Sequence, residues 1–181
     1  MSFRQEDEMG KAELLIDQFE RIRDAVYPAV NALSFEELTY RPDVESNSIS
    51  WLVWHLTRVQ DSVVSSLTGR ESVWTADGWF DRFGLALDQT DTGYGHDPET
   101  VGKVTSAAKP LLDYFEDVHQ RTVDWLATLD DAALSKVLDE TSIPPSTVET
   151  KLNAVIADDF QHAGQAAYVR GLVQRAELRR A

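Results

Sequence analysis

Two apolar segments of the sequence each contain side chains that can bind a metal ion. His55 lies in the segment 51–61, which is rich in tryptophan, leucine and valine. Asp158 and His162 are four residues apart, so on an α-helix their side chains share one face about one turn apart. If the two helices pair so that His55 meets them, the site is His-Asp-His. Three nitrogen and oxygen ligands, with a fourth position left to water or substrate, are typical of a catalytic zinc site.

Simpler interpretations exist for the same three residues. A histidine on an apolar helix is often a core residue whose ring is hydrogen-bonded to a backbone carbonyl. An aspartate and a histidine four residues apart arise often on polar helix faces. Their occurrence together favours the metal site if the fold is a bundle, because bundles build such sites from side chains on facing helices.

Charge and composition restrict the class of protein. The chain has 181 residues, with 31 acidic and 17 basic side chains and a formal net charge of -14. This charge repels phosphate backbones and anionic membranes, so we expect neither nucleic acid nor a membrane as a partner. Cysteine is absent, which excludes disulfides, thiolate metal ligands and a cysteine nucleophile. The N-terminal residues lack the pattern of a signal peptide, and a cytoplasmic location is predicted.

The elements that must position these residues follow from the spacing of apolar side chains. Steps of three and four residues predict four substantial helices within a single domain, residues 1–181. The helices are expected over residues 9–33, 48–67, 98–129 and 146–178. No segment is typical of a strand. The predicted fold class is therefore all-α, a four-helix bundle.

A long irregular loop is expected between the second and third helices. Residues 70–97 have no sustained period but contain tryptophan, phenylalanine and several glycines. A loop of this length inside a compact domain is often a lid or a binding loop, although its aromatic residues can also form local core. His96, in the glycine-rich part, is interpreted as a turn residue or loop anchor, with proton transfer as the alternative.

Three helical side chains complete the residue-level expectations. His119 is predicted to be exposed on the third helix. Asp159 points about 100° away from Asp158 around the helix axis and is predicted to face solvent. Gln165 lies one turn beyond His162, so it is predicted to orient that ligand by a hydrogen bond, with ordinary helix packing as the alternative.

Beyond these patterns, most of the chain resembles the DinB superfamily. The resemblance rests on phrases in the same order, namely Ser48 to Asp61, Trp79 to Gly84, Gly93 to His96 and Gln161 to Gly171. Within the superfamily the chain is most similar to the actinobacterial mycothiol S-transferases. The resemblance implies a bundle that holds a divalent metal with three residues from two helices, here His55, Asp158 and His162.

The carboxylate among these ligands bears on the metal. Many relatives have histidine at the position of Asp158, whereas mycothiol-dependent maleylpyruvate isomerases, which this chain also resembles, have a carboxylate there. Zinc is expected. Nickel, manganese and iron stay open, because a harder oxygen ligand also suits them.

The resemblance also implies a reaction, the transfer of mycothiol or a similar low-molecular-weight thiol to electrophilic small molecules in detoxification. A metal in this site would bind the sulfur and stabilise a thiolate that attacks the electrophile. Trp54 would form an apolar wall, while Arg82 and Arg170 would hold a polar part of the thiol cofactor or else form surface ion pairs. A mycothiol-dependent isomerase and a non-catalytic bundle that binds metal or a small ligand are the alternatives. The oligomeric state is open, and a homodimer is one alternative.

Overall fold

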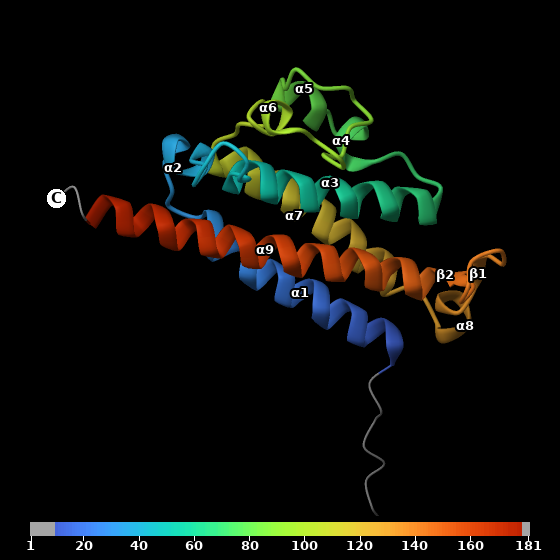
Figure 1. The fold of residues 1–181 in the computed structure, drawn as a ribbon. Coiled ribbons are helices and arrows are strands. Elements are labelled where there is room, and N and C mark those ends of the chain that lie inside the picture. Colours follow the sequence, from blue (N-terminus) through green and yellow to red (C-terminus); the bar gives the residue numbers. More distant parts are fainter. Residues whose placement is uncertain (1–9, 179–181) are drawn as a thin grey trace, which may run out of the picture.

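The structure, a computed structural model, describes the backbone of residues 10–178 and the side chains of residues 10–175. Its helices are α1 (Lys11–Val30), α2 (Phe35–Thr39), α3 (Ile49–Thr68), α4 (Val73–Ala76), α5 (Trp79–Phe83), α6 (Pro98–Val101), α7 (Ala108–Leu126), α8 (Asp131–Leu134) and α9 (Val148–Leu178). The long helices α1, α3, α7 and α9 form a bundle (Figure 1). The predicted fold class, an all-α four-helix bundle, is confirmed.

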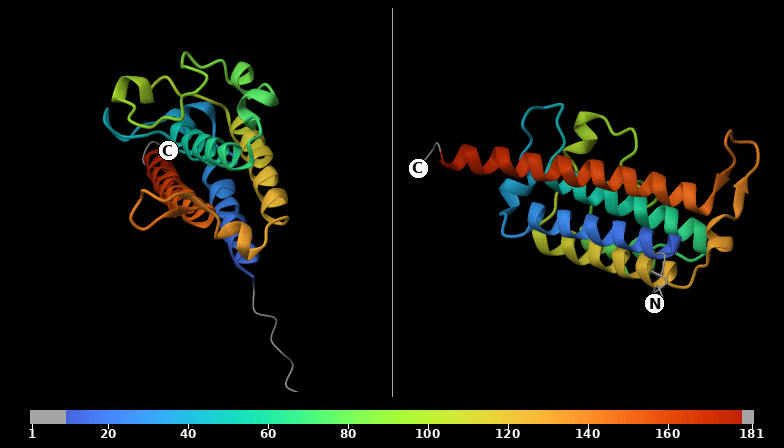
Figure 2. Two further views of the ribbon diagram at one scale, coloured as in Figure 1. Left: turned by 90° about the vertical axis from the view of Figure 1, so that its right-hand side faces the viewer. Right: turned by 90° about the horizontal axis from the view of Figure 1, so that it is seen from below.

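Helix α9 is the longest element and packs against two neighbours. It contacts α3 along one face and α1 along another, while α7 packs on α1 and α3 (Figure 2). Lys11 pairs with Glu149 near the start of α1 and α9, and Arg170 donates to the carbonyl of Asn31 near their other ends. Helices α1 and α9 therefore run in the same direction.

Local sequence explains where the helix that carries His55 begins and ends. The Ser48 hydroxyl accepts a hydrogen bond from the backbone N–H of Trp51 and so caps the start of α3. Gly69 ends the helix in the left-handed conformation, at φ 68°. Between these caps most side chains of α3 are buried, because α2, α7, α9 and the segment 70–97 all contact it.

Two expectations about the elements are wrong. The third helix does not begin at Pro98 and run on, because α6 ends at Val101 and α7 begins only at Ala108. Val101 and Val104 are both buried, so the chain between the helices turns into the core instead of continuing along one axis. The expectation of no strands fails as well, since β1 (Val137–Asp139) and β2 (Ser146–Thr147) pair antiparallel just before α9.

The segment 70–97 contains α4 and α5 and lies over α3, where buried polar groups fasten its start (Figure 1). The carboxylate of Asp61 on α3 accepts the backbone N–H groups of Val73 and Trp74, each at 2.9 Å. The same carboxylate accepts the hydroxyl of Tyr114 from α7, also at 2.9 Å. One buried side chain thus joins α3, α4 and α7.

Arg58, one turn before Asp61, fastens the end of the same segment. Its guanidinium lies over the ring of Trp74, 4.9 Å from the centroid, and donates to the backbone carbonyls of Gln89 and Asp91. The backbone that follows Asp91 is thereby held against the middle of α3. Within residues 10–178, no helix combines the length and apolar character needed to cross a membrane.

Candidate metal centre

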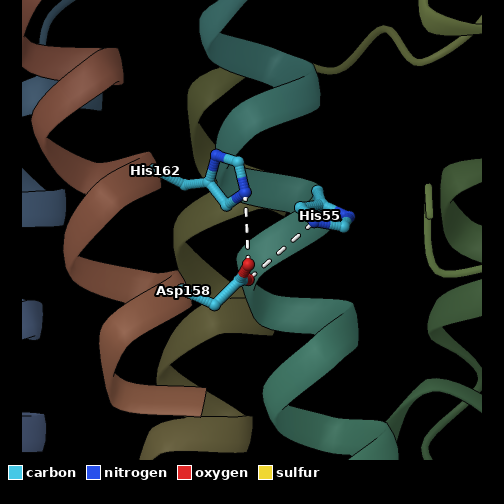
Figure 3. Close-up of side chains that lie close together, drawn as sticks. All are labelled: His55, Asp158 and His162. Carbon is cyan, nitrogen blue, oxygen red and sulfur yellow. Dashed lines mark ion pairs between the residues drawn. The ribbon is translucent and has the colours of Figure 1, made fainter. Parts of the chain in front are cut away.

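Three side chains converge where α3 faces α9 (Figure 3). His55 Nε2 lies 3.8 Å from Asp158 Oδ2, and His162 Nε2 lies 3.5 Å from Asp158 Oδ1. One ligand atom from each residue lies within 4.8 Å of the other two. The structure thus brings together the three predicted metal ligands, close enough for one cation to contact all of them.

Hydrogen bonds orient both imidazoles toward this point. His55 Nδ1 lies 2.5 Å from the carbonyl oxygen of Thr92, and His162 Nδ1 lies 3.0 Å from Gln165 Oε1. Because each Nδ1 donates its proton to a carbonyl oxygen, each Nε2 is left with a lone pair that faces Asp158. Metal-binding histidines have this arrangement, in which the second ring nitrogen donates to a carbonyl or carboxylate.

Asp158 provides an independent test of whether a cation fits. Its side chain is 34% exposed, yet Oδ2 is buried and has no hydrogen-bond partner among the residues that the structure describes. A buried carboxylate oxygen without a partner is energetically costly. A divalent cation held by this oxygen and the two Nε2 atoms would satisfy it, so the donor set fits a metal.

The pKa shifts favour the metal-binding form of His55 and Asp158 but not that of His162. Burial lowers the pKa of His55, which keeps its imidazole neutral. Burial raises the pKa of Asp158. The hydrogen-bond and charge interactions with His162 and the charge interaction with His55 lower this pKa by more, so its net shift is downward. Burial likewise opposes protonation of His162, yet contacts with Asp158 and Gln165 raise its pKa overall. A cation would therefore compete with a proton at His162.

Thr92 and Gly93, which we call the strap, pack closely against the imidazole of His55. Gly93 has φ 92°, and a Cβ at this position would lie 2.8 Å from His55 Nδ1 and 3.0 Å from the ring of Trp54. No other residue fits without displacing these rings. Sequence reasoning missed this role, although the two glycines of the 93–96 phrase were the available signal.

His55 is also held by an aromatic stack. The ring of Trp51 lies parallel to the imidazole, with centroids 4.6 Å apart, and its indole N–H donates to His96 Nδ1 at 3.1 Å. His96 Nε2 lies 2.9 Å from both carboxylate oxygens of Asp91. The interpretation of His96 as a loop anchor is confirmed.

The remaining predicted binding residues lie at different distances from the centre. Trp54 is 1% exposed and stacks on His96, so it forms part of the wall behind the centre. Gln165 makes the predicted orienting hydrogen bond to His162. Arg82 lies over the ring of Trp79 on α5, and Arg170 donates to a carbonyl at the end of α1. A role for either arginine in binding a cofactor stays a prediction.

Two expectations of exposure are wrong. Asp159 is 0% exposed, and neither carboxylate oxygen has a hydrogen-bond partner within the described part of the chain. Burial and the neighbouring Asp158 raise the pKa of Asp159 well above its usual value. His119 is 2% exposed, stacks on Phe115 and points Nε2 toward Glu20. Both residues lie on helices that pack against two neighbours, so the face that was expected to meet solvent meets a second helix.

Comparison with known proteins identifies the family and a shared fold. The model of the DinB superfamily matches residues 18–166. A crystal structure of a conserved protein from Enterococcus faecalis is similar, with a TM-score of 0.84 and 29% identity, covering 92% of this chain and 98% of that one. YfiT from Bacillus subtilis, described as a probable metal-dependent hydrolase with an unusual four-helix bundle topology, has a TM-score of 0.57 and 16% identity over 93% of this chain and 91% of its own. No functionally curated protein matches. The chain belongs to the DinB superfamily.

Proposed function

We propose that this protein is a metal-dependent thiol S-transferase that conjugates mycothiol or a similar low-molecular-weight thiol to electrophilic small molecules. The observation that carries the proposal is that one ligand atom each of His55, Asp158 and His162 lies within 4.8 Å of the other two, while Asp158 Oδ2 is buried without a hydrogen-bond partner among the described residues. Membership of the DinB superfamily and the description of YfiT as a probable metal-dependent hydrolase support the metal. The choice of a thiol rests on the resemblance to mycothiol S-transferases.

The charges of the protein groups suit a thiol as the next ligand. When bound, a divalent cation lowers the pKa of a thiol that coordinates it. One carboxylate from Asp158 and two neutral imidazoles leave net positive charge on such a centre, which favours an anion. Zinc suits this donor set, and nickel, manganese and iron are the alternatives.

The surroundings of the three ligands control access. Trp51 and the strap cover the imidazole of His55, which excludes water from that side. Asp158 remains 34% exposed, so a ligand can reach the centre past this residue. Trp51 also lies edge-on to His162 at 6.0 Å, which places an apolar wall beside the opening.

Elemental analysis of protein purified without a histidine tag tests the metal. We expect about one metal ion per chain, and marked loss of metal in His55→Ala, His162→Ala and Asp158→Asn. His119→Gln, which changes a histidine on α7, is the control and should keep its metal. Absence of metal after reconstitution, or an unchanged content in Asp158→Asn, would contradict the proposed centre.

Assays with the metal-loaded protein test the reaction. We expect mycothiol to be consumed stoichiometrically with a bromoalkyl or chloroalkyl probe, and the Asp158→Asn variant to lose this activity. Turnover of maleylpyruvate without net thiol consumption would instead identify a thiol-dependent isomerase. A metal-loaded protein that acts on neither substrate would favour the non-catalytic alternative.

A further inference from the structure

A groove of about 770 Å³ lies next to the candidate metal centre. Its walls are the chain from Pro42 to Asn47, the side of α3 at Leu52, and α9 between Gln161 and Leu172. Gln165 lines this groove and also accepts the Nδ1 proton of His162. His55, Asp158 and His162 do not themselves line the groove, but Gln161 precedes His162 directly and Gln165 is hydrogen-bonded to it, so the groove begins within one turn of α9 from the metal centre.

The wall from Pro42 to Asn47 is held in place by Arg41. The guanidinium of Arg41 donates to the carbonyl oxygens of Val44 and Ser46, and to that of Pro98 at 2.9 Å. These bonds tie the wall to α6. Because its N–H groups are directed at backbone carbonyls, Arg41 does not line the groove.

The charged groups that line the groove have one sign. Asp43 and Glu45 contribute carboxylates, and no lysine, arginine or histidine lines it in the part of the chain that the structure describes. A hydrogen bond from the Ser46 hydroxyl lowers the pKa of Asp43, so this carboxylate is ionised at neutral pH. An anionic ligand would meet no cation in the lining of the groove, although Arg41 behind the wall lies close enough to contribute to the lowered pKa of Asp43.

The other lining groups suit an uncharged or cationic molecule. Gln161, Gln165 and Asn47 offer amides that can donate and accept hydrogen bonds. Tyr168 is 66% exposed at the edge, and an aromatic face attracts a cation. Leu52, Val169 and Leu172 contribute the aliphatic part of the lining.

We propose that this groove selects the thiol by charge, and that it accepts a thiol whose remainder is cationic or uncharged and polar while it disfavours an anionic one. The inference rests on the proposed function. Asp43 and Glu45 are the residues that determine this specificity. Because both are near solvent, we expect their combined effect on binding to be roughly three- to tenfold at low ionic strength.

Three small thiols of different charge test the proposal. The cobalt-loaded full-length protein is titrated at low ionic strength with cysteamine, 2-mercaptoethanol and mercaptoacetate, and binding is read from the cobalt absorption spectrum. The thiols differ in their own acidity, so the informative quantity is the ratio of Kd for mercaptoacetate to Kd for cysteamine, compared between variants. Intrinsic differences between the thiols cancel in that comparison.

The double variant Asp43→Asn/Glu45→Gln removes both charges, and Asn keeps the oxygen that accepts the bond from Ser46. Asp124→Asn/Glu140→Gln is the control, because it changes the net charge equally at exposed positions near the end of α7 and in the β1–β2 turn, away from the groove. We expect the Kd ratio to fall roughly three- to tenfold in the groove variant and to stay unchanged in the control.

Three results would overturn the inference, and they can be told apart. An equal fall of the Kd ratio in both variants would show that the charge of the whole molecule, and not the groove, sets the preference. A ratio that neither variant changes would mean that Asp43 and Glu45 do not select the thiol. If none of the three thiols altered the cobalt spectrum of the unmodified protein, the proposed thiol function itself would fail, and the inference with it.

Discussion

The two histidines of the candidate metal centre are oriented by acceptors of different kinds. His55 donates to a backbone carbonyl, which no substitution removes, whereas His162 donates to the side chain of Gln165. We expect Gln165→Ala to weaken metal binding about 10- to 100-fold, because the ring of His162 loses the acceptor that fixes its tautomer. Competition with a chelating dye measures this affinity.

Gln161 supplies the matched control for that experiment. It lies one turn before Gln165 on α9 and lines the same groove, but it makes no hydrogen bond to His162 in the described structure. Gln161→Ala should bind metal as the unmodified protein does. Equal losses in both variants would mean that groove polarity, and not the orientation of His162, controls metal affinity.

Asp159 shows what helix periodicity leaves out at the level of one residue. The four-residue spacing of Asp158 and His162 is enough to predict that both share one face, and the structure places both beside His55. The same periodicity predicts that Asp159 faces solvent. A helix with a single neighbour has one buried face, and a rotation of about 100° from Asp158 places the next side chain outside that face. Helix α9 has two neighbours, and that fact is not contained in its own sequence.

The buried carboxyl of Asp159 predicts a pH-dependent stability. Its pKa is raised in the folded protein, so the neutral form is favoured and its contribution is fully present below the unfolded pKa of about 3.9. That contribution is lost as pH rises toward the folded pKa. Asp159→Asn does not titrate, so its stability relative to the unmodified protein should increase with pH, by at most about 1.4 kcal/mol per pH unit.

Urea unfolding of the metal-free proteins between pH 5 and pH 8 measures this difference. Effects of pH on all other groups cancel when variant and unmodified protein are compared at each pH. Asp124→Asn, at an exposed position of α7, should show a constant difference over the same range. A constant difference for Asp159→Asn as well would mean that Asp159 is ionised in the folded protein.

At the scale of elements, the strap over His55 depends on one glycine. Gly93 and Gly95 both have positive φ, at 92° and 76°, but only a Cβ at Gly93 would contact His55 and Trp54. Alanine at either position should cost about 1–2 kcal/mol of backbone strain. Only Gly93→Ala should also weaken metal binding, because it pushes the imidazole of His55 out of place.

Thermal unfolding and metal affinity measured on both variants separate the two effects. Gly95→Ala is the matched control, since nothing in the described structure lies within 4 Å of its added Cβ. A larger loss of stability in Gly93→Ala than in Gly95→Ala, with metal affinity reduced only in Gly93→Ala, would support the strap. If both variants kept the metal affinity of the unmodified protein, His55 would not need the strap.

The element boundaries that sequence reasoning missed have local physical causes. Pro98 does start a helix, and the side chain of Asp97 caps it by accepting the N–H of Thr100. The helix ends after one turn because the chain from Val101 to Val104 enters the core, which is a tertiary effect. Strands β1 and β2 are too short to show an alternating pattern, so no periodicity could reveal them.

At the scale of the whole molecule, the bundle was predictable and the placement of the segment 70–97 was not. Long amphipathic helices can be recognised from the sequence, because the spacing of their apolar residues repeats over several turns. The segment 70–97 is ordered instead by contacts with α3, chiefly those of Asp61 and Arg58. These contacts join residues that are distant in the sequence, and no local sequence pattern predicts them. They position the carbonyl of Thr92 against His55.

Asp61 therefore links global stability to the metal centre. It accepts two backbone N–H groups and the hydroxyl of Tyr114, and it lies 3.7 Å from Arg58. Asp61→Ala leaves these donors buried without their acceptor and should lower the free energy of unfolding by about 3–5 kcal/mol. Hydrogen exchange should rise most in the segment 70–97, and metal affinity should fall because the carbonyl of Thr92 is no longer held on His55.

A comparison with Asp77→Asn separates this effect from the loss of any ion pair. Asp77 pairs with Arg121 at 3.0 Å between partly exposed side chains, and such pairs contribute only about 0–1 kcal/mol. Asp77 belongs to the same segment, so its variant tests whether a surface contact there is enough to hold the strap. Exchange in the segment 70–97 that stayed slow in Asp61→Ala, despite a large loss of stability, would mean that the strap is held from elsewhere. We expect fast exchange together with weakened metal binding in Asp61→Ala. That result would show that the buried carboxylate of Asp61 on α3 holds the segment 70–97 over the metal centre.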